Sequence, residues 1–169
     1  MSSTVVVVAD WIKRIADDER RRDAARRMDD ETAARKADLV RRNGQRLIDE
    51  LRATVERDVD AFNSEFPGDA ARSVVVDAAP DGGFVVRKGS SAGGSLSVTP
   101  NLVAAVAVCT YRFVVTNGMP PREDRLDVLF VEDATGVLQM KHRSTGQVFA
   151  NADALSEFLL VPVLTGRPR

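Results

Sequence analysis

The chain has 169 residues, of which 44% are apolar, and a formal net charge of −1. That length corresponds to one domain with at most an appendage, and the apolar content is that of a globular protein. A balanced charge argues against a protein dedicated to nucleic acid, because binding the phosphate backbone requires a surplus of lysine and arginine. The sequence therefore predicts a folded protein, and its charge disfavours nucleic acid as the partner.

The chain has one cysteine, Cys109, and one histidine, His142. A single cysteine excludes an internal disulfide and a cysteine-based zinc site, and it is typical of a reducing compartment. The first residues lack the features of a secretion signal, and no stretch approaches the ~20 apolar residues that cross a membrane. We expect a cytoplasmic protein with no membrane contact, no metal and no cofactor. Twenty arginines against four lysines indicate a GC-rich bacterial genome.

The first 66 residues contain no proline and one glycine. From Asp10 to Phe62 there are 14 basic and 14 acidic residues. This composition predicts one long helix that ends before Pro67-Gly68, since such a pair stops a helix and starts a turn. At ~1.5 Å per residue the helix would be longer than a small domain is wide. Part of it must therefore meet a partner or solvent.

The second half of this helix has an apolar face. Its apolar residues and one glycine recur at steps of three and four, which is the period of one helix face. They are Val40, Gly44, Leu47, Ile48, Leu51, Val55, Val59 and Phe62. The spacing departs from a strict heptad, so we expect packing on a globular domain rather than a coiled coil. Glycine costs about 1 kcal/mol in a helix interior, so a break at Asn43-Gly44 is the alternative to a continuous helix.

The first half of the helix offers no such face. Between residues 16 and 38 the only apolar side chains are alanines and Met28. Acidic residues precede arginines by four positions, and each such pair stabilises a helix by ~0.2–0.5 kcal/mol. The pairs are Asp17–Arg21, Asp18–Arg22, Asp23–Arg27 and Glu31–Arg35. We therefore divide the chain into a charged helical arm, 1–38, and a single α+β domain, 39–169.

After Gly68 the sequence predicts strands separated by turn residues. The expected strands are Arg72–Ala78, Phe84–Lys88, Ser95–Thr99, Leu102–Val115, Leu126–Glu132, Gly136–His142 and Gln147–Ala150. Short connections make consecutive strands antiparallel neighbours. A last helix, 152–164, is expected to be capped by Asn151. The predicted fold is α+β: a long N-terminal helix packed by its second half on an antiparallel meander of about six or seven strands, plus a short C-terminal helix.

The longest predicted strand has small residues early and aromatic residues late on one face. Alternation places them together, because successive side chains of a strand point to opposite faces. They are Ala105, Ala107, Cys109, Tyr111 and Phe113. We expect a helix to cross closely at the alanine end, with Gly44 as its counterpart.

Residues that could carry out catalysis are scarce. His142 lies between Lys141 and Arg143, where we expect a solvent-exposed surface residue. Cys109 lies within a strand and is expected in the core. The loop 88–95 is rich in glycine and serine, but its lysine precedes the glycines and it joins two strands, so we expect a flexible hairpin loop rather than a phosphate site. We predict no catalytic, cofactor-binding or metal-binding residue and no enzymatic activity.

The charged shaft of the arm contains two acidic runs, Asp17-Asp18-Glu19 and Asp29-Asp30-Glu31, around an arginine block, 20–27. Successive helical residues diverge, so the acidic runs are expected to be solvated rather than metal-binding. The acidic runs screen the arginines within about a Debye length, and no aromatic residue is interleaved for base stacking. We expect a self-screened helix surface, with a protein contact or a nucleic-acid contact as the weaker alternatives.

An apolar tip precedes the shaft. It comprises Val5, Val8, Trp11, Ile12 and Ile15. Exposed apolar patches with tryptophan are typical of protein interfaces. The alternative is that the tip folds back onto the core of its own domain.

Two functions from different classes follow from these features. The first is a non-catalytic interaction or assembly protein that uses its arm to bind a second copy, as a homodimer, or another protein. The alternative is a small-ligand-binding domain with a pocket between the sheet and the helix. That pocket would be lined by Tyr111, Phe113, Phe130 and the alanine-rich strand.

Overall fold

The structure, a computed structural model, describes residues 9–89, 93–114 and 118–169. The chain forms two compact units, Met1–Lys36 and Ala37–Arg169. Its elements are α1 (Asp10–Glu65), β1 (Val74–Ala78), β2 (Phe84–Lys88), β3 (Gly94–Asn101), β4 (Val106–Phe113), β5 (Arg122–Glu132), β6 (Leu138–His142), β7 (Val148–Phe149) and α2 (Ala152–Thr165). The predicted α+β fold, with its long helix, antiparallel meander and C-terminal helix, is confirmed.

Helix α1 is continuous through Asn43-Gly44, so the alternative of two helices is wrong. The predicted apolar face is confirmed, since its residues from Val40 to Phe62 are all buried or half-buried. Gly44 is buried, and a Cβ atom at this position would lie 2.7 Å from Cδ2 of Leu102. The expected close approach therefore exists, but Leu102 of the β3–β4 turn makes it rather than the alanines.

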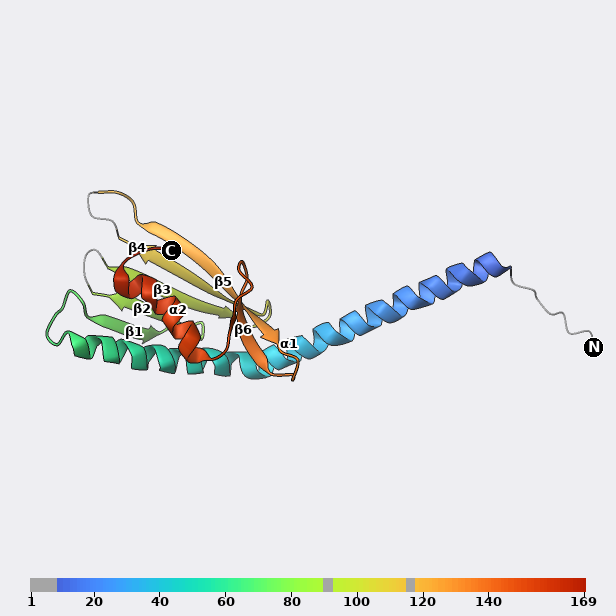
Figure 1. The fold of residues 1–169 in the computed structure, drawn as a ribbon, viewed down its shortest axis with the longest axis horizontal. Coiled ribbons are helices and arrows are strands. Elements are labelled where there is room, and N and C mark those ends of the chain that lie inside the picture. The colour runs from blue at the N-terminus through green and yellow to red at the C-terminus, as the bar shows by residue number, and fades with distance from the viewer. Residues whose placement is uncertain (1–8, 90–92, 115–117) are drawn as a thin grey trace, which may run out of the picture. The chain divides into compact units, whose positions relative to one another are not determined.

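The seven strands pair in chain order as one antiparallel half-barrel sheet (Figure 1). The register places Leu96 opposite Tyr111, and Tyr111 opposite Asp124. Alternate residues of each strand are buried, as in β3, where Leu96 and Val98 are buried and Ser97 is half-exposed. One face of the sheet therefore carries the core.

Both helices of the second unit pack on that face. One cluster of buried apolar residues joins the second half of α1, the inward residues of the strands and α2. Figure 1 shows α2, in red, lying across the sheet. The two helices also contact each other, because Oγ of the fully buried Ser156 donates to Asp58, with 2.7 Å between the oxygens. The core is thus closed on its helical side by two helices rather than one.

The strand boundaries depart most from the prediction at the starts of β4 and β5, and the other strands differ by at most two residues at their ends. Leu102 to Ala105 form a turn instead of the start of β4: the Asn101 side chain accepts a hydrogen bond from the Ala104 amide, and Ala105 has a φ of 54°. Strand β5 begins at Arg122 instead of Leu126, with Arg122 paired to Phe113. Backbone pairing extends this strand through a polar stretch that has no apolar alternation.

Helix α2 is capped at both ends. Oδ1 of Asn151 accepts a hydrogen bond from the Ala154 amide at 2.9 Å, which confirms the predicted N-cap. Gly166 ends the helix in the left-handed region, with a φ of 66°. The Lys88 ammonium donates to the Leu164 carbonyl at 2.6 Å, a favourable place for a cation next to a helix C-terminus.

Within the residues described, neither helix is both long enough and apolar enough to cross a bilayer.

Candidate functional site

The apolar tip of the arm is exposed in the part that the structure describes. The solvent-exposed fractions of Trp11, Ile12 and Ile15 are 59%, 44% and 55%. Val5 and Val8, which we assigned to the same surface, lie outside the described residues. No residue from 9 to 36 is buried. The described part of the tip is therefore a solvent-facing surface of one tryptophan and two isoleucines.

Three of the four predicted ion pairs of the shaft differ from those in the structure. At Asp17, Asp18 and Asp23 the partner is the arginine three positions later, with N–O distances of 2.8, 3.4 and 3.8 Å. The predicted four-residue spacing is wrong at these three aspartates, although both spacings bring side chains together on a helix surface. Four arginines of the block pair with acidic residues of their own helix, as expected for a self-screened surface: Arg20, Arg21, Arg22 and Arg26.

His142 is buried, with only 9% of its surface exposed, so its assignment as a surface residue is wrong. Lys141 points to the other face of β6 and Arg143 follows the strand as an exposed residue, whereas His142 continues the inward row of Leu138 and Met140. Nδ1 accepts hydrogen bonds from the amides of Ser144 and Thr145, at 3.1 and 3.2 Å. A neutral imidazole whose Nδ1 accepts carries its proton on Nε2.

A pocket of about 280 Å³ lies between the sheet and α2. Its sheet wall comprises Tyr111, Phe113, Asp124, Arg125, Leu126 and His142, and the rest of its lining comprises Ser144, Phe158, Pro162 and Arg169. Tyr111 and Phe113 thus line a pocket as expected, with ring centroids 5.9 Å apart. Phe130 does not line it, being completely buried, and the helix involved is α2 rather than α1.

Pro162 and Arg169 shape the helical side of this pocket. A proline inside a helix cannot donate to the carbonyl four positions earlier, here that of Phe158. The Arg169 guanidinium donates to this carbonyl at 2.9 Å and lies over the Phe158 ring, 3.9 Å from its centroid. The residues after α2 are therefore held against the pocket by a hydrogen bond that Pro162 makes available.

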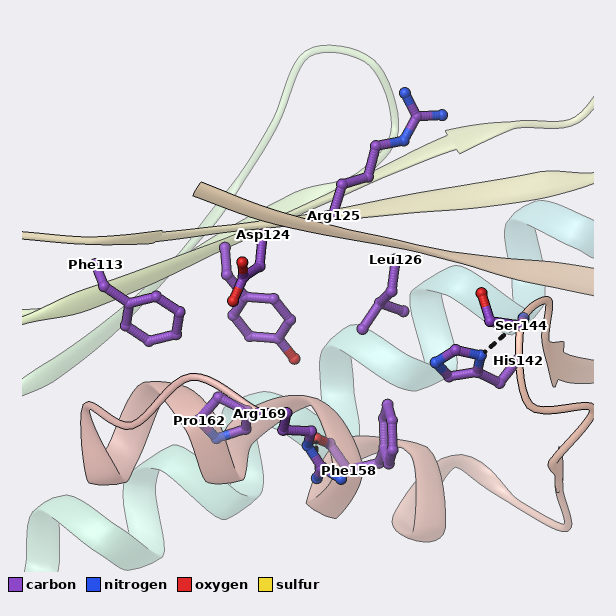
Figure 2. A pocket seen from close by; sticks show the side chains of 10 residues that line it. Phe113, Asp124, Arg125, Leu126, His142, Ser144, Phe158, Pro162 and Arg169 are labelled. Atoms are coloured by element: carbon purple, nitrogen blue, oxygen red, sulfur yellow. Dashed lines mark hydrogen bonds between the residues drawn. The ribbon is translucent and has the colours of Figure 1, made fainter. Parts of the chain in front are cut away.

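The pocket wall is anchored by Tyr111. Its hydroxyl donates to the carbonyl of Leu159 at 2.7 Å, which ties β4 to α2. The imidazole of His142 packs edge-on against Phe158, with ring centroids 5.6 Å apart. Figure 2 shows the imidazole between Leu126 and Phe158, with the edge opposite Nδ1 facing the pocket, while Arg125 points away.

Cys109 is in the core, as expected, with 1% of its surface exposed. The segment 88–95 joins antiparallel strands β2 and β3, as expected, but residues 90–92 lie outside the described residues. Among the residues that the structure describes, no three His, Cys, Asp or Glu side chains converge as metal ligands. The Cys109 side chain belongs to the buried apolar cluster of the core.

Burial raises the pKa of the Cys109 thiol from 9.0 to about 12, with a further contribution from Asp127. As the pH rises, the thiol loses its proton in the unfolded chain before it does so in the folded one. The stability that the protonated Cys109 contributes is therefore fully present below pH 9 and is lost progressively above it. We expect the free energy of unfolding to fall by about 1.4 kcal/mol per pH unit above that point through Cys109 alone. Denaturant unfolding between pH 8 and 11 measures this slope.

The Cys109→Ala protein is the control for the loss of stability at alkaline pH. It should be less stable at pH 8 because a buried side chain is truncated, yet its stability should fall less steeply between pH 9 and 11. Some decline should remain, since burial also raises the pKa of Tyr111. Equal slopes in the two proteins would contradict the contribution of Cys109.

Comparison of the chain with protein-family models, with curated proteins and with solved structures found no match in any of the three.

Proposed function

We propose that this protein is a non-catalytic assembly protein that self-associates through its N-terminal helical arm. The observation that carries the proposal is the exposure of Trp11, Ile12 and Ile15, at 59%, 44% and 55%. A tryptophan with two isoleucines on one helix end is a large apolar patch to leave in water, and such residues are typical interface anchors.

The tip has the spacing of a helix face that becomes buried. Trp11, Ile12 and Ile15 follow the same i, i+1, i+4 pattern as Leu47, Ile48 and Leu51 of the same helix. In the second set Ile48 and Leu51 are buried in the core at 1% exposure. Because this spacing puts three side chains on one face, the tip has the geometry required to pack against another element.

The charge of the shaft favours a second copy of this chain as the partner. Residues 10–36 contain eight acidic and nine basic side chains, in short blocks of alternating sign. Because the net charge of each helix is close to zero, two copies do not repel each other. The acidic blocks of one copy can also lie against the basic blocks of the other. A strongly charged partner such as nucleic acid gains little from a nearly neutral helix.

Support for a non-catalytic role comes from the state of the two most reactive side-chain types. The pKa of the only thiol, Cys109, is raised to about 12, whereas a nucleophilic cysteine needs a lowered one. Nδ1 of the only histidine already accepts two backbone hydrogen bonds, so no carboxylate orients it as in a catalytic triad.

The mass of the full-length chain in solution tests the proposal. At about 50 μM we expect sedimentation velocity to give a dimer or larger species, since even weak specific interfaces reach micromolar affinity. The full-length Trp11→Ser/Ile15→Asp protein should sediment as a monomer. Met28→Ser, which removes an apolar side chain that is 68% exposed but lies outside the tip, is the matched control and should leave the association unchanged.

Trp11 is the only tryptophan, so its fluorescence reports the tip alone. Its emission should shift to longer wavelength as the protein is diluted from the associated state, because the indole becomes exposed to water. A monomeric wild-type chain at about 50 μM, or a double variant that associates as the wild type does, would overturn the proposal. A monomer with buried-type Trp11 emission would instead support folding back onto the same chain.

A further inference from the structure

The pocket between the sheet and α2 offers a second site, independent of the arm. Its volume of about 280 Å³ is just below the range of roughly 300–1,000 Å³ that holds drug-sized ligands. Aromatic and apolar side chains supply most of its surface, among them Phe113, Leu126 and Pro162. A space of this size and character fits a small organic molecule with an apolar body.

His142 directs an unused hydrogen-bond donor into this space. The residue as a whole is 9% exposed. Nδ1 accepts two backbone hydrogen bonds, so Nε2 carries the proton. No acceptor for Nε2 occurs within 9–89, 93–114 and 118–169, and the edge of the ring opposite Nδ1 faces the pocket (Figure 2). Among the described residues no side-chain nitrogen or oxygen is both fully buried and without a partner, so Nε2 is reached from the pocket and is available to an acceptor atom there.

Arg169 supplies a positive charge next to the same ring. It contacts one side of Phe158 while His142 contacts the ring edge-on. One guanidinium nitrogen donates to the Phe158 carbonyl, which leaves further N–H groups to donate. Among the described residues, Arg169 has no carboxylate partner. Two donors around one aromatic ring, one of them cationic, select an anionic acceptor.

The one carboxylate that lines the pocket does not reverse this preference. Asp124 is paired with Arg122, with 3.3 Å between Oδ1 and Nε, and it retains about a third of its exposure. Arg125 points away from the pocket and is paired with Asp127 at 3.1 Å. The charge of Asp124 is therefore balanced by Arg122, whereas among the described residues no carboxylate balances the charge of Arg169.

We infer that this pocket binds a small organic carboxylate with an apolar body, whose carboxylate accepts hydrogen bonds from Nε2 of His142 and from Arg169. The apolar body lies among Phe113, Leu126 and Pro162. This site goes beyond the proposed self-association, because it uses none of the residues of the arm.

A matched set of three probes tests the inference on the full-length protein. These are 3-phenylpropionate, its neutral amide and the cationic 3-phenylpropylamine, which share an apolar body and differ in charge. His142 is the only histidine, so its imidazole NMR signals report the pocket without overlap. We expect 3-phenylpropionate to shift these signals saturably and to bind at least about tenfold more tightly than the amide, since a charge-assisted hydrogen bond is about twice as strong as a neutral one.

Arg169→Gln should weaken 3-phenylpropionate binding about tenfold and should leave binding of the amide nearly unchanged. Arg167→Gln is the matched control: it removes the same charge two residues away, from an exposed side chain that does not line the pocket, and should leave the affinity as it is. No shift of the His142 signals at millimolar probe, equal affinity for acid and amide, or a preference for the amine would each overturn the inference. None of these results bears on the oligomeric state, so the two proposals fail separately.

Discussion

Replacing Gly83 with alanine is expected to lower the free energy of unfolding by at least about 3 kcal/mol, the upper end of the usual range for one substitution. A Cβ atom at this position would lie 1.8 Å from the carbonyl oxygen of Val98 and 2.9 Å from its carbonyl carbon. These are backbone atoms of the neighbouring strand, so no side chain can rotate away to make room. The strand itself would have to move.

The surroundings of Gly83 allow little movement. Its carbonyl accepts from the Ala79 amide and its amide donates to Asp81, both at 2.9 Å, which fixes the β1–β2 turn. On the other side, β3 is paired with β2 through Phe84 and Val98. Opening that spacing would break the pairing of β2 with β3, two strands whose inward side chains belong to the core. The whole fold, rather than one turn, should therefore be weakened.

Gly68→Ala is the control for this prediction. Gly68 has a φ of 76°, and no atom of the described residues lies within 4 Å of a Cβ placed there. Alanine at this position has to adopt only a left-handed backbone, which costs roughly 1–2 kcal/mol. Denaturant unfolding followed by far-UV circular dichroism measures both variants. A Gly83→Ala protein no less stable than Gly68→Ala would contradict the approach of Val98.

Local periodicity was enough to predict the long helix and its buried face. The steps of three and four from Val40 to Phe62 depend only on the geometry of a helix, and the structure confirms them. The turn at Leu102–Ala105 could not be recognised in this way, because its residues are apolar and resemble a strand. It depends on the Asn101 side chain and on the φ of 54° at Ala105, which are details of local conformation.

The pocket was harder to predict than the helix. The wrong assignment of His142 came from its charged neighbours, although the period of two through Leu138, Met140 and His142 carried the correct signal. The helical wall could not be anticipated, because it brings Phe158 and Arg169 against strands that are distant in sequence. Pro162 was a usable clue, since a proline inside a helix leaves a carbonyl that requires another donor. Which group would donate depends on tertiary structure.

Helix α1 carries one isoleucine in the core, Ile48, and one at the exposed tip, Ile12, and the same substitution should affect them very differently. Ile48→Asp should cost more than about 4 kcal/mol, because it places a carboxylate in an apolar core where Ile48 is 1% exposed. Natural domains are stable by only about 5–15 kcal/mol, so this variant should be largely unfolded or close to it. Far-UV circular dichroism and denaturant unfolding at about 1 μM, where association contributes little, measure the effect.

Ile12→Asp is the matched control, with the same change at the equivalent position of the tip pattern. Ile12 is 44% exposed, so the free energy of unfolding at low concentration should change by less than about 0.5 kcal/mol. Self-association should nevertheless be lost, since a charge would be introduced into the proposed apolar contact. Equal destabilisation by the two substitutions would mean that the tip is buried in its own domain. Undiminished association of the Ile12→Asp protein would mean that another surface holds the copies together.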